Sequence, residues 1–352
     1  MSKASAARRL AAAAAFGGGG LGLLGGSFYG LLRAQAKFAR HVIGRHDTPP
    51  PDSSGVYGRG LPGHPIRLSV LGDSAACGYG MADADETTGA LLAAGLAELA
   101  QRPVRVVVDA AVGAESKDLD AQTDRALTTE PDVVAIIVGA NDVTHTVRPS
   151  QSVRYLEQAV RRLRDAGCAV VVGTCPDLGT VRPISPPLRQ VARLWSRRLA
   201  AAQTIVVVEA GGRSVSLGSI LGPEFDAAPA ELFGLDRFHP SAAGYESLAS
   251  AMLPTLAAAL GLVPEAQEAP QSYRGEGVMP VAYAAAEAVG AAGTEVAPAE
   301  VDGRRRGPRG LWVALRHRRR RPLPAVDRLE EEQEAARESD HESEPETAGG
   351  LS

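Results

Sequence analysis

The middle of the chain alternates short, largely apolar runs with longer amphipathic stretches. Five apolar runs are typical of buried strands: Arg67–Leu71, Val104–Val108, Val133–Val138, Ala169–Gly173 and Ile205–Val208. The amphipathic stretches have helical periodicity: Thr87–Gln101, Lys117–Thr128, Ser152–Asp165, Leu188–Ala201 and Ala242–Leu253. Strands that are apolar throughout and separated by helices indicate a parallel sheet covered on both faces. The pattern predicts a doubly wound α/β domain with a five-stranded parallel sheet over residues 66–261.

The first 45 residues are a hydrophobic segment with basic flanks. Leu10–Leu32 contains no charged residue and is long enough to cross one bilayer. Lysine and arginine occur both before and after it, so the charge bias assigns no orientation. We expect a signal anchor that associates the protein with a membrane through residues 10–32, the side being open. Two alternatives are a mobile Ala/Gly arm and a signal peptide cleaved at Ala34-Gln35-Ala36, after which the protein is secreted.

Two other segments lack the pattern of a packed core. Residues 46–65 are rich in Pro, Gly and Ser and are expected to form a linker. Residues 262–352 show no hydrophobic periodicity and are rich in Pro, Ala, Arg and Glu, which predicts a disordered tail. The net charge of −4 is a sum over basic and acidic blocks, so it excludes no class of partner.

The tail contains a basic stretch, Arg304–Arg321, followed by an acidic one, Asp327–Glu346. The basic stretch has only Trp312 as an interleaved aromatic and belongs to no known binding fold, so no specific nucleic acid is expected as a partner. Two interpretations stay open: a segment that faces anionic lipid, and a solvated charge run neutralised by the acidic residues after it.

Three cysteines, Cys77, Cys168 and Cys175, are too few for a disulfide scaffold and have no spacing typical of zinc ligands. We expect free thiols.

The residues that directly follow the expected strands carry the candidate chemistry, because ligands of an open α/β sheet bind at the carboxyl ends of its strands. Gly72-Asp73-Ser74 follows the first strand and Gly113 lies beyond the second. Gly139-Ala140-Asn141-Asp142 follows the third, and Asp236-Arg237-Phe238-His239 precedes the last helix. We expect these groups to converge at one edge of the sheet.

Each group fits a step of acyl transfer. A serine hydroxyl becomes a good nucleophile when a base takes its proton, so His239 would serve Ser74. Asp236, three residues before His239, can fix the tautomer of the imidazole. The N–H groups of Ser74 and Gly113 and the side-chain amide of Asn141 can form an oxyanion hole, with glycine at 113 allowing close approach of the backbone.

In these four blocks the sequence resembles the SGNH hydrolases, also called GDSL-like lipases and esterases. The resemblance covers about residues 66–260, and Ala75 stands where the family name has leucine. It implies a flavodoxin-like three-layer α/β/α fold, Ser74 as nucleophile, Asp236 and His239 as the rest of the triad, and Gly113 and Asn141 as oxyanion donors. It also implies that neither a metal nor an organic cofactor takes part.

The expected function is therefore a serine esterase or lipase-like hydrolase that cleaves an acyl or acetyl ester through an acyl-enzyme. The same residues would serve an O-acyltransferase or a carbohydrate O-deacetylase, and a binding protein without turnover could also use this fold. With six Phe, two Trp and seven Tyr in the chain, a small acyl pocket is favoured over a platform for polysaccharide. Four loops are expected to form its walls: 81–86, 144–148, 174–187 and 211–235. The oligomeric state is open.

Four residues beside the expected site are assigned structural roles. We expect Asp73 and Asp142 to accept hydrogen bonds from turn N–H groups. His145 is interpreted as a surface histidine and Cys77 as a small buried side chain. Ser74, Gly113 and Asn141 each have a structural alternative as well: a helix cap, a turn glycine and a loop amide.

Overall fold

The computed structural model describes residues 27–39, 41–43, 48–262 and 295–296. By its contacts the chain divides into two units, residues 1–312 and 313–352, and all the described residues belong to the first. Most of the expected anchor, Leu10–Leu32, lies outside the described residues, as do the basic and acidic blocks of the tail. In the described part of the chain, no helix is long and apolar enough to cross a membrane.

The centre of the domain is a sheet with the strand order β1-β3-β2-β4-β5-β6-β7. Five neighbouring strands are parallel: β3 (Val104–Val108), β2 (Ile66–Gly72), β4 (Val133–Ile137), β5 (Ala169–Gly173) and β6 (Arg213–Val215). The first parallel strand in the chain lies inside the sheet with the second strand on its outer side, which is the flavodoxin-like order. The predicted fold class is confirmed.

Two short strands lie antiparallel at the edges of this parallel core. β1 (Gly55–Tyr57) pairs with β3, and β7 (Glu295–Val296) pairs with β6. The expected linker, residues 46–65, thus contains an edge strand, and residues 295–296 of the expected disordered tail are paired.

The fifth parallel strand differs from the prediction. Ile205–Val208 is the last part of helix α6 (Leu188–Glu209), and the strand is β6, five residues further on. Val207 and Val208 are buried in this helical conformation, so the apolar run satisfies its burial without becoming a strand. The helix ends where Gly211 adopts a φ of 83°, and the N–H of Gly212 donates to the carbonyl of Val207 at 2.8 Å.

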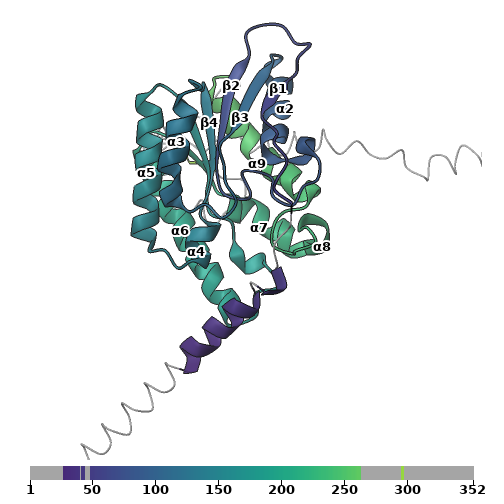
Figure 1. Cartoon of the computed structure of the whole chain (residues 1–352). Coiled ribbons are helices and arrows are strands. Elements are labelled where there is room, and N and C mark those ends of the chain that lie inside the picture. The colour runs from purple at the N-terminus through teal and green to yellow at the C-terminus, as the bar shows by residue number, and fades with distance from the viewer. Residues whose placement is uncertain (1–26, 40, 44–47, 263–294, 297–352) are drawn as a thin grey trace, which may run out of the picture. The chain divides into compact units, whose positions relative to one another are not determined.

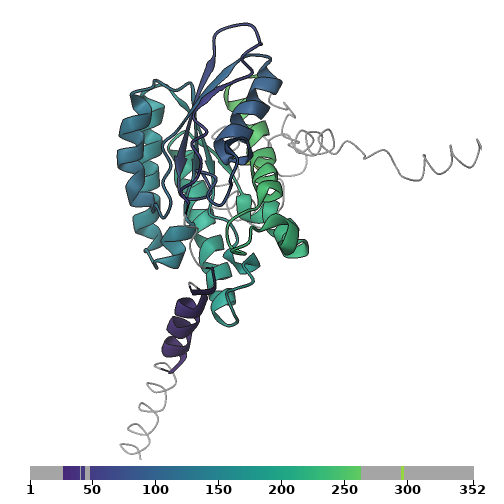
Figure 2. The same cartoon turned by 45° about the vertical axis from the view of Figure 1, so that its right-hand side comes forward.

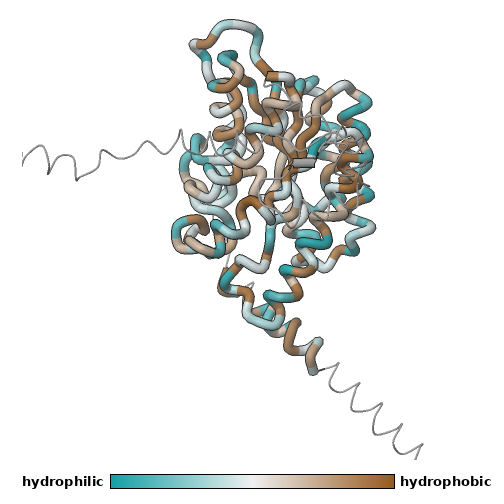
Figure 3. Tube along the Cα trace, turned by 180° about the vertical axis from the view of Figure 1, so that it is seen from behind, coloured by the Kyte–Doolittle hydropathy of each residue, from teal (hydrophilic) through white to brown (hydrophobic). Residues whose placement is uncertain are grey.

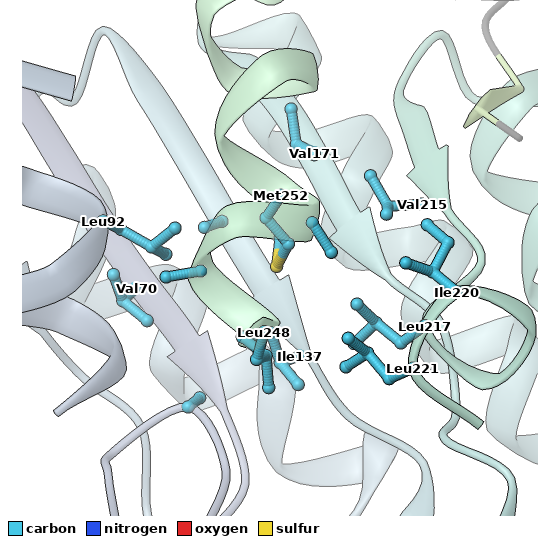
Figure 4. Close-up of a cluster of buried hydrophobic side chains, with 14 of the residues drawn as sticks. Val70, Leu92, Ile137, Val171, Val215, Leu217, Ile220, Leu221, Leu248 and Met252 are labelled. Atoms are coloured by element: carbon cyan, nitrogen blue, oxygen red, sulfur yellow. The ribbon is translucent and has the colours of Figure 1, made fainter. Parts of the chain in front are cut away.

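Helices cover both faces of the sheet (Figures 1 and 2). One face carries α3 (Leu119–Leu127), α5 (Pro149–Asp165) and α6, and the other carries α2 (Thr88–Ala100) and α9 (Ala242–Ala259). α7 (Leu217–Ala227) and α8 (Pro229–Leu232) pack beside α9, and α4 (Ala140–Thr144) follows β4. The strands run as hydrophobic segments through the middle of the domain (Figure 3). Figure 4 shows part of the core between α9, α7 and the sheet.

The register of the sheet sets the position of the candidate site. Gly72 at the end of β2 pairs with Ile137 at the end of β4. The chain segments that leave these two strands therefore begin side by side at the carboxyl edge of the sheet, where the sequence places its candidate residues.

Candidate active site

Ser74 lies in the turn that leaves strand β2. The preceding Gly72 has a φ of 132°, and a Cβ there would lie 1.8 Å from the carbonyl oxygen of Ile137, so only glycine fits. Gln122 of α3 holds this glycine from the other side. Its Oε1 accepts from the N–H of Gly72 at 2.7 Å, and its Nε2 donates to the Gly72 carbonyl at 2.9 Å. The turn that carries Ser74 is thus fixed by the sheet and by a buried side-chain amide.

The structure brings Ser74, His239 and Asp236 together. His239 Nε2 is 3.0 Å from Ser74 Oγ, and His239 Nδ1 is 2.6 Å from Asp236 Oδ2. The other carboxylate oxygen, Asp236 Oδ1, accepts from the N–H groups of Phe238 and His239 at 2.9 and 3.0 Å. Arg237, which lies between Asp236 and Phe238, has a φ of 56°, and this conformation closes the turn. These bonds hold the carboxylate and the imidazole in one rigid loop before α9.

The contacts of His239 assign its tautomer. Because Asp236 can only accept, Nδ1 carries the proton, and the lone pair of Nε2 points to the Ser74 hydroxyl. Burial raises the pKa of Asp236, but the hydrogen bonds from the His239 side chain and from the Phe238 and His239 N–H groups outweigh it. The net pKa lies below its ordinary value, so the carboxylate stays charged beside the imidazole.

Two aromatic rings with no role predicted from the sequence flank this imidazole. Tyr79 and Phe238 meet His239 edge to face, with ring centroids 4.7 and 4.8 Å away. Tyr79 is itself held by the buried hydroxyl of Tyr245, which donates to its carbonyl at 2.9 Å. In the sequence, only the position of Tyr79 five residues after Ser74 indicated that its ring could lie near His239.

The two expected oxyanion loops are joined to the nucleophile turn and to each other. The loop after β3 bonds to β2 through the N–H of Ala111, which donates to the Gly72 carbonyl at 3.1 Å. Asn141, in the first turn of α4, donates from Nδ2 to the carbonyl of Ala114 at 2.9 Å. An amide nitrogen carries two hydrogens, so one stays available after this bond. The N–H groups of Ser74 and Gly113 donate to no acceptor among the described residues.

Glycine at 113 has a conformational reason besides the expected close approach to the oxyanion, which stays a prediction. A Cβ at this position would meet no protein atom within 4 Å, so packing against the protein does not require glycine. Its φ of 83° does, because side chains disfavour this region of the backbone.

Asp73 and Asp142 connect the loops of the site. Asp73, which is 2% exposed, accepts from the N–H of Ala75 at 3.0 Å and faces the N–H groups of Gly139 and Ala140. Burial raises the pKa of Asp73 to about 7. Asp142 accepts from the N–H of Ser116 at 3.1 Å. The two carboxylates therefore fasten the nucleophile turn, the loop after β3 and α4 to one another.

The remaining titratable neighbours have no direct part in the triad. His145 is half exposed and its Nδ1 lies 2.8 Å from Glu115 Oε1. The three cysteines are free and buried, and burial raises the pKa of Cys77 to about 12. Among the described residues, no cluster of three or more His, Cys, Asp or Glu side chains could hold a metal ion.

An apolar cavity of about 90 Å³ opens beside Ser74 and His239. Its walls come mainly from residues 176–181, after β5, and from α7 and Phe233. Two of the four loops expected to form a pocket, 174–187 and 211–235, contribute to this cavity, whereas 81–86 and 144–148 do not line it. A helix, α7, stands where a loop was expected.

Comparison with known proteins identifies a family for this chain. Residues 70–246 match the model of the GDSL-like lipase/acylhydrolase family. A GDSL-like esterase of Mycobacterium tuberculosis is 43% identical over 243 residues, which cover 65% of this chain and 77% of that protein.

Solved structures similar to this chain include LAE5, an alpha/beta hydrolase from the metagenome of Lake Arreo, with 24% identity and a TM-score of 0.45 over 56% of this chain and 96% of LAE5. Another is Axe2, an acetylxylan esterase from Geobacillus stearothermophilus, with 23% identity and a TM-score of 0.41, covering 56% of this chain and 96% of Axe2.

Proposed function

Since the chain belongs to the GDSL-like lipase/acylhydrolase family and is a carboxylic ester hydrolase, we propose that Ser74, His239 and Asp236 cleave the ester through an acyl-enzyme. The observation that carries this proposal is the unbroken hydrogen-bonded chain from Ser74 Oγ through His239 to Asp236.

In the first half of the proposed reaction, His239 Nε2 takes the hydroxyl proton while Ser74 Oγ bonds to the ester carbonyl carbon. The resulting imidazolium is stabilised by the Asp236 carboxylate, and the carbon–oxygen bond to the alcohol then breaks. The leaving oxygen receives the proton from Nε2, so the alcohol departs neutral and the acyl group stays on Ser74.

In the second half, water replaces the alcohol at the same place. Nε2 takes a proton from the water, the hydroxide oxygen bonds to the acyl carbon, and Ser74 leaves with the proton restored. Both halves pass through a tetrahedral oxyanion. The N–H groups of Ser74 and Gly113 and the free hydrogen of Asn141 Nδ2 are proposed to bind it.

An activity-based probe tests the proposal without knowledge of the natural substrate. A fluorophosphonate labels a serine only when a base activates its hydroxyl, so wild-type protein should be labelled and Ser74→Ala should not. Ser69→Ala is the matched control, because Ser69 lies in β2 just before the turn and is fully buried. Labelling of the Ser74→Ala variant, or its retention of most p-nitrophenyl ester hydrolysis, contradicts the triad.

We also propose that the enzyme is retained at a membrane through its N-terminal segment. The uncharged run 10–32 supports this, as do the exposed side chains of Phe28, Tyr29 and Phe38 in the helix of residues 27–39. Gln35 of that helix bonds to the carbonyl of Pro186 at 2.7 Å and to the N–H of Leu188 at 3.2 Å. Cleavage after Ala36 would remove these contacts, so they favour a retained segment over a cleaved signal peptide.

Fractionation of cells that express the full chain tests this second proposal. The wild-type protein should sediment with membranes, and the double variant Leu21→Arg, Leu24→Arg should shift to the soluble fraction with its esterase activity unchanged. A wild-type protein found only in the soluble fraction, or one whose first residue lies just after Ala36, overturns it.

A further inference from the structure

The cavity beside the triad presents almost only hydrocarbon to its interior. Its lining includes six large apolar side chains: Leu178, Val181, Leu217, Leu221, Phe225 and Phe233. They come from η3 (Leu178–Thr180) and the residue after it, from α7 and from the segment before α9. Figure 4 shows Leu217 and Leu221 pointing from α7 toward Ile137 of β4 and Leu248 of α9, which also line the cavity. The lining is therefore built by distant parts of the chain.

The polar residues in this wall already have partners. The Asp177 carboxylate accepts from the N–H of Gly179 at 2.8 Å and from Arg197 at 3.0 Å. The Thr180 hydroxyl donates to the Asp177 carbonyl at 2.8 Å. Because these groups are satisfied within the protein, the wall beyond Ser74 and His239 offers few hydrogen bonds to a sugar hydroxyl or to another polar group.

The chemistry at Ser74 decides which limb of the ester enters the cavity. The alcohol must leave from the His239 side and water must take its place, so that limb needs an open path. The acyl limb stays bonded to Ser74 during this exchange and can occupy an enclosed apolar space. The residues proposed to bind the oxyanion beyond the nucleophile turn, Gly113 and Asn141, do not line the cavity, so the space is not the place of the carbonyl oxygen.

We propose that this cavity binds the acyl chain of an aliphatic ester longer than acetate, and that Leu221 sets the accepted chain length. The inference rests on the proposed role of Ser74. A water molecule needs roughly 10 to 15 Å³ of such space, so a cavity of about 90 Å³ holds about six to nine water-sized groups, many more than the methyl of an acetyl group. The chain that fits best has about four to eight carbons. Each methylene that enters raises kcat/KM by about fourfold until the cavity is full.

Leu221 has a matched control in the same helix. Leu221 and Ile220 are neighbours in α7 and are each 6% exposed, but only Leu221 lines the cavity. In Figure 4, Ile220 lies on the side of Val215 rather than toward Ile137. Alanine at either position removes a similar volume from the core, so the two variants differ mainly in whether the removed atoms face the cavity.

The experiment measures kcat/KM for p-nitrophenyl esters from acetate to dodecanoate. Leu221→Ala should move the optimum to longer chains, and Leu221→Phe should move it to shorter ones, with octanoate losing at least tenfold relative to acetate. Ile220→Ala and Ile220→Phe should keep the wild-type profile. Thermal melting confirms that each variant is folded. If one of the two Leu221 variants does not fold, the chain-length profile of the other Leu221 variant tests the proposal.

A second ester series assigns the limb. For acetates of alcohols of increasing length, kcat/KM should depend on alcohol length in the same way in wild type and in both Leu221 variants. A profile that is flat in the wild type, or that shifts equally in the Ile220 and Leu221 variants, overturns the proposal, and so does a shift confined to the alcohol series. Ser74→Ala separates this failure from failure of the triad, because loss of the nucleophile removes activity on all esters alike.

Discussion

The exchange of Asp236 for asparagine tests the proposed triad at the residue that orients His239. In the wild-type loop, Oδ1 of Asp236 is held by the N–H groups of Phe238 and His239, and Oδ2 faces His239 Nδ1. An asparagine has one oxygen, and the two backbone donors should keep it at the Oδ1 position. Its NH₂ group then faces Nδ1 and can only donate. The imidazole is forced to carry its proton on Nε2, where it cannot accept the proton of Ser74.

The size of the effect follows from the two bonds that change. To reach the productive tautomer, the variant must give up the bond between the amide and Nδ1 and place two donors against each other. Relative to wild type, the productive tautomer lacks the charge-assisted bond from Nδ1 to the Asp236 carboxylate, a loss of about 1.5 to 3 kcal/mol, and a buried donor without a partner costs about 1 to 3 kcal/mol more. At about 1.4 kcal/mol per factor of ten, kcat should fall by about 10² to 10⁴. The same exchange in a serine protease triad costs about 10⁴.

The assay is steady-state hydrolysis of a soluble p-nitrophenyl ester by folded Asp236→Asn protein. We expect kcat to fall while KM stays within about twofold, since Asp236 does not line the cavity. Asp226→Asn is the control, because Asp226 is an exposed carboxylate in an ion pair with Arg182. A loss of less than about tenfold in kcat, with the fold intact by circular dichroism, would refute the assigned tautomer and the role of Asp236.

Three further predictions concern the surroundings of the triad. Asn141→Ala should lower kcat by about 10² to 10³ with little change in KM, because one oxyanion donor is lost, and an effect on KM alone would assign Asn141 to substrate positioning. Asp73 has a folded-state pKa of about 7, raised above the ordinary 3.8, so its contribution to stability is full at acid pH and is lost as pH rises toward and past 7. Between pH 4.5 and pH 8, the free energy of unfolding in urea should therefore fall by about 3 kcal/mol more in wild type than in Asp73→Asn. Equal changes in both proteins would contradict the burial argument. Finally, the raised pKa of Cys77 predicts that iodoacetamide leaves this thiol unmodified in native protein at pH 8 and labels it after unfolding, as mass spectrometry would show.

The parallel sheet was predictable because a strand buried on both faces must be apolar throughout. β2, β3, β4 and β5 were each located from that signal within one or two residues. The same signal failed at 205–208, because an apolar β-branched run has the same composition in a buried strand and in the buried end of a helix. What decides here is the neighbourhood: the run continues a helix begun at Leu188 and ends against the left-handed Gly211.

The candidate site was predictable for a related reason. In a parallel sheet the residues after each strand meet at one edge, so Ser74, Gly113 and Asn141 could be placed near one another from strand ends alone. The residues that hold the site in place could not be predicted in this way. Gln122, which holds Gly72, is a single polar residue on a helix, and nothing local distinguishes it from an exposed glutamine. A partner 50 residues away in the chain makes it a buried one.

The cavity beside Ser74 and His239 could not be predicted from the sequence. Its main helix, α7, contains Pro223 and two glycines, so local preference favours a loop over residues 217–227. Tertiary burial of Leu217, Leu221 and Phe225 overrides that preference. Positions of the catalytic atoms follow from the backbone geometry of strand ends, which has few solutions, whereas the cavity depends on how three distant segments pack, which has many. Substrate preference in such a fold can therefore change through α7 while the triad stays unchanged, and the contrast between Leu221 and Ile220 measures this separation directly.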